Sequence, residues 1–103
     1  MAKSNGNYHV NGEEFATKDA LTKRVRQIRD KYLGNKILNE TDAAFIRDLL
    51  THHTEAAEKA GIGLKHFTVE KNRDGTDSFY ITRTDGSRDD FSFKTCITNI
   101  RRM

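Results

Sequence analysis

The chain lacks several features that would point to other classes of protein. It has no proline, no tryptophan and a single cysteine, Cys96, among 103 residues. One cysteine cannot form an internal disulfide, which excludes a disulfide-stapled scaffold and fits a reducing cytosol. No apolar run approaches the roughly 18 residues that a membrane-spanning helix needs, and no signal-peptide segment is seen near the N-terminus. We therefore expect a cytoplasmic protein with no membrane partner.

What is present is enough for one folded domain. Three tyrosines and six phenylalanines are spread along the chain, more than a disordered chain of this charge usually carries. A chain of this length supports a single hydrophobic core. Because no linker, repeat or low-complexity tract interrupts it, we predict a disordered tail over residues 1–7 and one domain, favoured as a monomer, over residues 8–103.

Charge is unevenly distributed although the net charge is only +3. Residues 18–31 contain six bases and two acids, which gives +4, whereas residues 40–58 contain five acids and one base, which gives −4. A basic surface beside an acidic one can attract a polyanion locally. Both segments are equally compatible with solvated helix faces.

The N-terminal half has the patterns of a hairpin followed by a helix. An Asn-Gly pair at residues 11–12 lies within the β-prone residues 8–15 and tolerates the positive φ angles of a type I′ turn. Thr17 can cap a helix that begins at Lys18 and is ended by Gly34. The apolar residues that recur on one face of this helix are Leu21, Val25, Ile28 and Tyr32.

The basic residues of this helix point away from its apolar face. Lys23 and Arg26 lie opposite that face. Arg24 and Lys31 share one flank, and Arg29 lies on the other. These outward cations can contact phosphate groups or only water.

A second helix is predicted from near Thr41, with Asp42 at the positive end of its dipole. His53 falls on the apolar side of this helix, so we expect a partly buried, hydrogen-bonded histidine. Thr54 can cap a short helical turn that Gly61 ends. The buried face is predicted to contain Phe45, Ile46, Leu49 and Leu50.

After Gly63 the apolar period changes from 3.6 to 2 residues, which indicates strands. Asp-Gly pairs at residues 74–75 and 85–86 predict turns of an antiparallel meander. A closing helix capped by Ser92 is then expected. The strands are predicted over residues 64–71, 78–84 and 88–93. The fold class is therefore α+β: a small N-terminal hairpin, two to three helices packed on a three-stranded antiparallel meander, and a C-terminal helix.

The second half also carries family-specific motifs, LLTHHTEAAEKAGIGLKHFTVEK, FYITRTDG and DDFSFKTCI. They resemble the DCL-like family, named for a plant protein required for chloroplast development, over about residues 15–97. Thr54 stands where that family usually has proline. The positions that match the family pattern are His53, Lys59, Gly61, Gly63, Phe67, Val69, Phe79, Arg83, Asp85, Gly86, Asp90, Phe91, Ser92 and Cys96.

The resemblance implies work linked to RNA. In that family a plastid member is needed for ribosomal RNA maturation, and related domains lie at the C-termini of plant-specific RNA polymerase largest subunits. On this basis we expect a non-catalytic nucleic-acid-associated module that prefers RNA to DNA and binds it in a salt-dependent way. Tyr80, if outward on the sheet, is a candidate for stacking a base. The bases expected to contact phosphate are Lys23, Arg24, Arg26, Arg29, Lys94, Arg101 and Arg102.

Several motif residues also have a structural explanation. Arg83 shares its strand face with apolar residues and needs a partner, for which Asp90 is the candidate; the alternative is an arginine held for a phosphate or carboxylate. Gly61 and Gly63 fit a helix stop and chain reversal better than a dinucleotide site. Cys96 fits a small buried hydrophobe.

Two other function classes stay open. A protein-interaction module would use the acidic residues 40–58 or a sheet edge. A metal-dependent hydrolase would need His53, Cys96, Asp85 and Asp90 to converge in space. The adjacent His52 and His53 cannot chelate one ion as residues four apart on a helix do. We predict no catalytic residue, no metal ligand and no cofactor.

Overall fold

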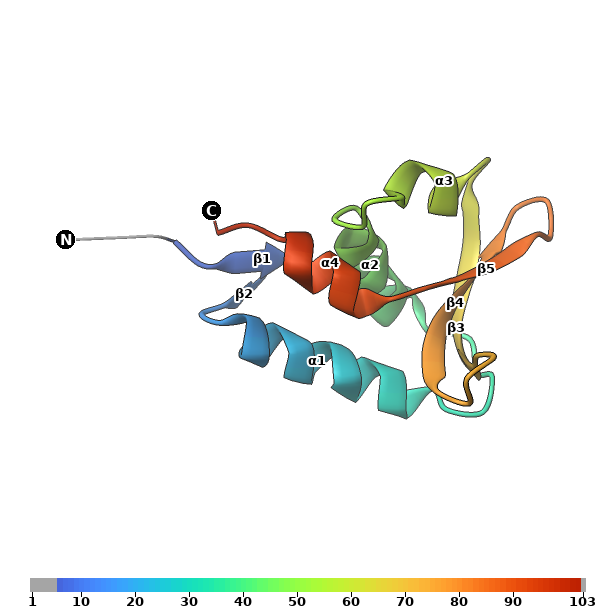
Figure 1. Ribbon diagram of the computed structural model, residues 1–103, viewed down its shortest axis with the longest axis horizontal. Coiled ribbons are helices and arrows are strands. Elements are labelled where there is room, and N and C mark those ends of the chain that lie inside the picture. The colour runs from blue at the N-terminus through green and yellow to red at the C-terminus, as the bar shows by residue number, and fades with distance from the viewer. Residues whose placement is uncertain (1–5, 103) are drawn as a thin grey trace.

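The computed structural model describes residues 6–102, so most of the predicted tail, residues 1–5, lies outside the described part. Helices pack on one face of a three-stranded sheet, beside an N-terminal hairpin (Figure 1). The predicted α+β class is therefore confirmed. The elements are β1 (Tyr8–Val10), β2 (Glu13–Phe15), α1 (Lys18–Lys31), α2 (Glu40–Leu50), α3 (Ala56–Ala60), β3 (Leu64–Lys71), β4 (Asp77–Arg83), β5 (Arg88–Phe91) and α4 (Phe93–Asn99).

The hairpin forms as predicted. Asn11 and Gly12 both have positive φ angles, 50° and 82°, so they close the turn between the antiparallel strands β1 and β2. The backbone N–H of Asn11 donates a hydrogen bond of 2.6 Å to Asp48 in α2. The turn is thus tied to the helical layer.

Capping residues set the starts of the two long helices. The Thr17 hydroxyl accepts the N–H of Ala20 at 3.1 Å, as predicted for α1. In α2 the cap is Asn39, whose side chain accepts the N–H of Asp42 at 2.8 Å, so the helix begins slightly before the predicted Thr41. Asp42 then lies in the first turn, where a carboxylate is favourable.

The meander is confirmed, with strand order β3-β4-β5 and antiparallel pairing throughout. The loop after α1 runs beside β3. The N–H groups of Asn35 and Leu38 donate to the carbonyls of Val69 and Phe67 at 3.0 and 2.9 Å. These bonds satisfy part of the β3 edge, which would otherwise be open to pairing with another chain.

Of the two other predicted caps, Thr54 is wrong and Ser92 is right in position. Thr54 does not cap α3, because Glu55 occupies the cap position and its N–H donates to Nδ1 of His53 at 3.0 Å. Ser92 occupies the cap position of α4 but its side chain makes no capping hydrogen bond. Phe93, expected at the end of a strand, is the first residue of α4 because β5 ends at Phe91.

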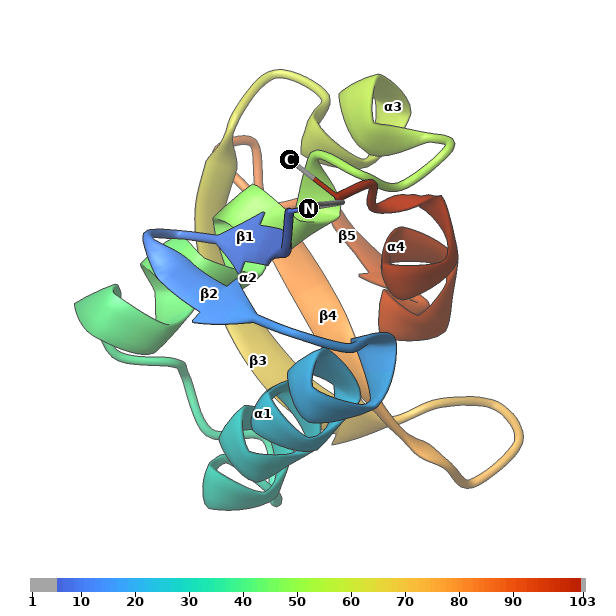
Figure 2. The same ribbon diagram turned by 90° about the vertical axis from the view of Figure 1, so that its left-hand side faces the viewer.

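One core joins the helices to the sheet. Apolar stripes of α1, α2 and α4 cover the face of β3 and β4 that carries Phe67, Phe79 and Ile81, all fully buried. Figure 2 shows α1, α2 and the hairpin lying over that face. Each large side chain so buried contributes about 1.5–3 kcal/mol of transfer free energy. Within residues 6–102 no helix has the length and apolarity needed to cross a membrane.

Candidate nucleic-acid interface

The two flanks of α1 have different roles. On one flank the Arg24 guanidinium binds Glu13 through two hydrogen bonds of 3.0 and 3.2 Å and lies 5.1 Å from the ring centre of Phe45. Because these hydrogen bonds to the Glu13 carboxylate favour the charged guanidinium, they raise the pKa of Arg24 above its ordinary value. Lys31 on the same flank binds buried Asp42 at 2.7 Å. The cations on this flank are used to hold the hairpin and α2.

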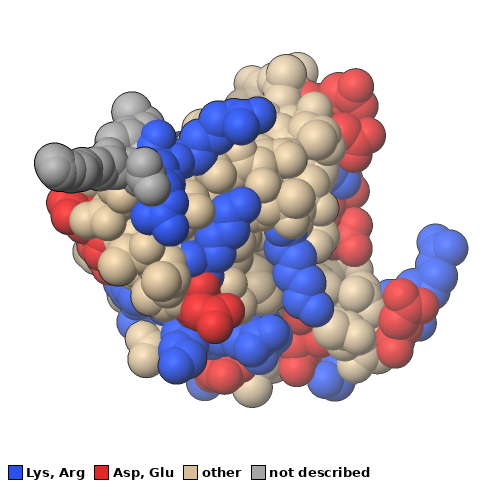
Figure 3. All heavy atoms as spheres, turned by 60° about the vertical axis from the view of Figure 1, so that its left-hand side comes forward, with Lys and Arg blue, Asp and Glu red and all other residues tan. Residues whose placement is uncertain are grey.

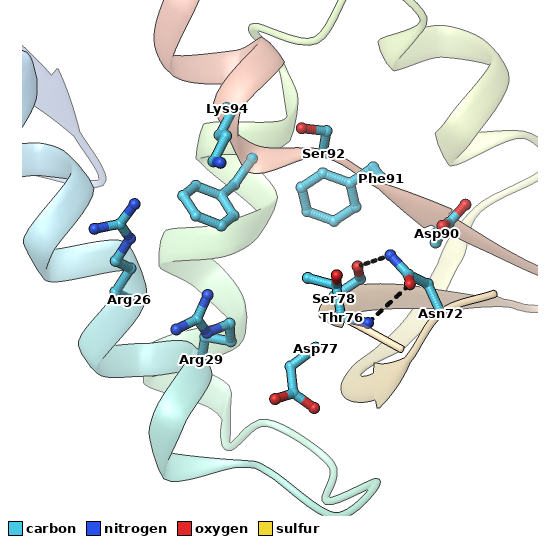
Figure 4. A pocket seen from close by; sticks show the side chains of 11 residues that line it. Arg26, Arg29, Asn72, Thr76, Asp77, Ser78, Asp90, Phe91, Ser92 and Lys94 are labelled. Carbon is cyan, nitrogen blue, oxygen red and sulfur yellow. Dashed lines mark hydrogen bonds between the residues drawn. The ribbon is translucent and has the colours of Figure 1, made fainter. Parts of the chain in front are cut away.

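The other flank faces α4 and contributes to a basic pocket. Arg26 and Arg29 of α1 and Lys94 of α4 line one pocket of about 260 Å³. Figure 4 shows the three side chains on the same side of this pocket. Arg29 also pairs with its exposed neighbour Asp30 at 3.0 Å. Three residues predicted to contact phosphate are thus brought together from segments about 65 residues apart, Arg29 to Lys94 in the sequence.

Beyond the cations, this pocket has an apolar floor and a polar far wall. Phe91 and Phe93, both almost fully buried, line it between the cations and the sheet. The far wall comes from the start of β4, its preceding turn and β5. There the Asn72 amide donates to the Ser78 hydroxyl at 2.8 Å, and the Asp90 carboxylate lies beside them (Figure 4). The pocket therefore has a cationic side, an apolar floor and a polar side with two carboxylates, those of Asp77 and Asp90.

The other predicted phosphate-binding residues lie outside the pocket. Arg102 donates to the carbonyls of Gly6 and Ala16 at 3.1 and 3.2 Å and lies 4.6 Å from the ring centre of Tyr8, so it holds the two ends of the described chain together. Lys23 and Arg101 are exposed. On the face drawn in Figure 3, Lys and Arg side chains form a band, with one acidic cluster within it and other acidic side chains at its margins.

Two family-motif residues, Lys59 and Arg83, form a clamp with Asp89 that fixes α3 to the sheet. The Asp89 carboxylate accepts Lys59 at 3.0 Å and Arg83 at 3.3 Å. Arg83 also donates to the carbonyls of Lys59 and Glu58 at 2.9 and 3.3 Å. Burial by itself raises the pKa of Asp89, but the bonds from Lys59 and Arg83 outweigh it and lower the pKa. The clamp therefore holds a charged carboxylate.

The predicted partner of Arg83 is wrong. Asp90 pairs with Tyr80 across β4 and β5, on the outer face of the sheet, whereas Asp89 pairs with Ile81 on the core face. Only Asp89 can reach Arg83, because successive residues of a strand point to opposite faces. The Asp90 carboxylate has no hydrogen bond or ion pair with residues 6–102.

Gly61 and Gly63 form the chain reversal that was predicted. Gly61 has a φ of 55°, and a Cβ there would lie 2.9 Å from Cδ and Nε of Arg83. The Gly63 carbonyl accepts the N–H of Thr84 at 3.0 Å. Glycine is thus required at position 61 by the close approach of the clamp.

The remaining motif residues lie in turns or in the core. Asp85 accepts the N–H and the hydroxyl of Ser87 at 2.9 and 2.6 Å in the turn that contains Gly86. The His53 ring packs edge to face on the Phe91 ring, with 6.3 Å between the ring centres. Cys96 is fully buried, and burial raises the pKa of its thiol to about 12.

The histidine, cysteine and aspartates considered for a metal do not converge. Among residues 6–102 no group of three or more His, Cys, Asp or Glu side chains is placed to hold a metal ion. The acidic residues 40–58 are partly used inside the chain, because Asp42 is buried against Lys31 and Asp48 accepts from Asn11.

Sequence reasoning predicted Tyr80 on the outer face of the sheet but missed its neighbours Arg88 and Glu70. Arg88 of β5 crosses β4, lies 5.4 Å from the ring centre of Tyr80 and binds Glu70 of β3. Tyr80 is half-buried and, together with Asn72, Arg73, Asp74 and Asp90, lines a second pocket of about 340 Å³. The strand alternation that predicted an outward Tyr80 also contained the signal for Arg88.

Fold and surface together define a small α+β domain whose α1–α4 side carries a basic pocket. The chain belongs to the family described as Protein of unknown function (DUF3223), which matches residues 26–97. That match includes all three residues of the cationic side. The resemblance to the DCL-like family is not addressed by this match and stays a prediction.

The chain is also similar to two known proteins, and the second of them supports the fold. The chain is 32% identical over 86 residues, 82% of its length, to DNA-directed RNA polymerase IV subunit 1 of Arabidopsis thaliana, of which it spans 6%. It is also similar to the solution NMR structure of an uncharacterized protein from Rhodospirillum rubrum. The TM-score is 0.83 and the identity 35%, with 93% of this chain and 91% of that chain covered.

Proposed function

We propose that this domain is a non-catalytic RNA-binding module that holds the phosphate backbone on its α1–α4 side. The observation that supports this most is the grouping of Arg26, Arg29 and Lys94 around one pocket. Exposed Lys23 and Arg101 extend the same function along the strand of RNA. Arg24 and Arg102, also predicted at the sequence level, support the fold of this surface through their contacts within the chain.

Physical chemistry and the relatives both favour this proposal. Cations that neutralise phosphates release condensed counterions, so binding is salt-dependent and only weakly sequence-specific. The similarity to a region of a polymerase subunit is consistent with work on nucleic acid. The resemblance to the DCL-like family favours RNA over DNA and an accessory role in ribosomal RNA processing. The proposal keeps the predicted cytoplasmic location and monomeric state.

Fluorescence anisotropy tests the proposal directly. The purified domain is titrated into single-stranded RNA, structured RNA and duplex DNA at about 50 and about 200 mM salt, a range over which phosphate contacts weaken sharply. We expect RNA to bind more tightly than DNA at low salt, and the affinity to fall as salt rises. Absence of binding to all three at low salt would contradict the proposal.

A protein-interaction module is the second candidate, favoured by one observation. Ile62 lies between two glycines and is 70% exposed, the most exposed large apolar side chain among residues 6–102. Capture of a defined protein partner that survives nuclease treatment and is lost in Ile62→Ser would favour this candidate. Capture that nuclease abolishes would favour RNA instead.

A further inference from the structure

The basic pocket does not end at the edge of the sheet. The pocket beside α1 and α4 and the pocket on the outer face of the sheet share two lining residues, Asn72 and Asp90. They therefore adjoin around the turn between β3 and β4. A ligand that enters the first pocket at its cationic side can continue onto the outer face.

The second pocket has the features of a stacking site for a nucleic-acid base. Tyr80 supplies an aromatic ring to this pocket. The Arg88 guanidinium, which does not line the pocket, lies 5.4 Å from the centre of that ring and is bound to Glu70, so a base can stack only on the side of the ring that faces the pocket. Because the ring is half-buried and the arginine is fixed, little side-chain freedom is left to lose when a base stacks there. Arg73 in the turn adds an exposed cation at the rim.

Asp90 lies between the two pockets, and its carboxylate is a charged group of this wall that has no partner among residues 6–102. Asn72 is occupied, because its amide bonds Ser78 and its oxygen accepts the N–H groups of Asp74 and Thr76. The Asp90 carboxylate, in contrast, has no hydrogen-bond donor or cation as a partner among residues 6–102. A carboxylate accepts N–H donors and repels phosphate, so it favours the base of a nucleotide at this position.

We propose that the two pockets form one track for single-stranded RNA, with phosphate at Arg26, Arg29 and Lys94, a base stacked on Tyr80, and a guanine edge read by Asp90. Guanine fits best because its N1–H and N2–H₂ groups present two neighbouring donors to the two carboxylate oxygens. Uracil presents one N–H between two carbonyl oxygens and fits least. This inference rests on the proposed function and specifies its ligand.

Each residue of the track has a matched variant. Tyr80→Leu removes the ring, whereas Tyr80→Phe keeps it and serves as the control. Asp90→Asn keeps the shape but replaces one acceptor oxygen with a donor. Thermal melts check that the variants fold. The probes are fluorescein-labelled RNAs of about ten nucleotides, a length typical of one single-strand-binding domain, one of uridines only and one alternating uridine with guanosine.

The expected results separate stacking from base reading. The alternating RNA binds the wild-type protein at least about fivefold more tightly than oligouridine, and Asp90→Asn removes that preference. Tyr80→Leu lowers the affinity for both RNAs at least about fivefold, the lower limit for loss of one stacked base, and leaves the salt dependence of binding unchanged. Tyr80→Phe binds both RNAs as tightly as the wild type.

Two contrary results have different meanings. If salt-dependent binding persists but the wild-type protein does not distinguish the two RNAs, or Tyr80→Leu binds both as wild type, the track is wrong while the phosphate-binding proposal stands. If neither RNA binds at low salt, the proposed function fails and the track fails with it.

Discussion

Asp42 is a buried carboxylate whose charge is held by two partners. It is 3% exposed, and Lys31 and Tyr32 each donate to its Oδ2 at 2.7 Å. Burial by itself raises the pKa of Asp42, but the hydrogen bonds from Lys31 and Tyr32 outweigh it, so the pKa lies below its ordinary value. Asp42 thus links α1 to α2 in its ionised form.

The lowered pKa of Asp42 predicts a stability change in acid. The contribution is complete above the unfolded-state pKa of about 4 and is lost as pH falls through the lower folded-state pKa. Asp42→Asn should lower the free energy of unfolding by about 1–3 kcal/mol near neutral pH. When the pH is then lowered, the variant should lose less further stability than the wild type does, which urea unfolding at both pH values measures. Asp30→Asn, which breaks only an exposed pair, should cost about 0–1 kcal/mol. An acid loss in Asp42→Asn equal to that of wild type would contradict this role.

Cys96 should behave as an inert core residue. Burial raises the pKa of its thiol to about 12, so thiolate, the reactive form, is scarce at ordinary pH. We expect native protein to react with a thiol reagent at about pH 8 far more slowly than protein in denaturant, which should react at the ordinary rate of a free thiol. Rapid stoichiometric labelling of the native protein would show that the core around α4 is open.

At the scale of elements, α3 depends on the clamp of Lys59, Arg83 and Asp89. This helix has only five residues and buries none of them, so packing alone does not hold it. Gly61 ends α3 where the Arg83 side chain passes, and Arg83 in turn binds the last carbonyls of the helix. Loss of the close approach at Gly61 should therefore loosen α3 before the rest of the fold.

Gly61→Ala tests this coupling. A Cβ 2.9 Å from the middle of the Arg83 side chain forces that side chain to move, in addition to the strain of a positive φ. Gly75→Ala is the control, because its φ is 80° but nothing lies within 4 Å of the added Cβ. The control should lower the free energy of unfolding by about 1 kcal/mol, and Gly61→Ala should lower it by about 1–2 kcal/mol more. Gly61→Ala should also speed hydrogen exchange across residues 56–60. Equal costs for the two variants would show that the approach is not constraining.

Most elements follow from local patterns, whereas their connections do not. The Asn-Gly turn, the stripe of α1 and the alternation of β3 and β4 each depend on neighbouring residues and were predicted. The cap at Asn39 was missed because Thr41, which is also an acceptable capping residue, lies two positions later. The Asp89 partnership was predictable, since the alternation that buries Phe91 also turns Asp89 toward the core face and Asp90 outward.

At the scale of the whole molecule, topology decides which predicted cations act together. The helical wheel separates Arg24 from Arg29, but only the packing of α4 against α1 shows that the Arg29 flank meets Lys94. The hairpin occupies the opposite flank and pairs with Arg24. Neither neighbour is fixed by local sequence, because both are distant along the chain. The outer-face track of Tyr80 and Asp90 likewise depends on long-range strand pairing.

The central claim, that Arg26, Arg29 and Lys94 bind phosphate together, is tested most directly by the salt dependence of RNA affinity. For single strands the logarithm of the affinity falls with the logarithm of salt by about 0.7 per phosphate neutralised. The matched control, Lys36→Ala, Arg47→Ala and Lys65→Ala together, removes the same charge from exposed positions outside the pocket. We predict that replacing Arg26, Arg29 and Lys94 with alanine reduces the slope by about 2, while the control leaves it nearly unchanged. Equal reductions in the two triple variants would show that only net charge matters and would contradict a phosphate site at this pocket.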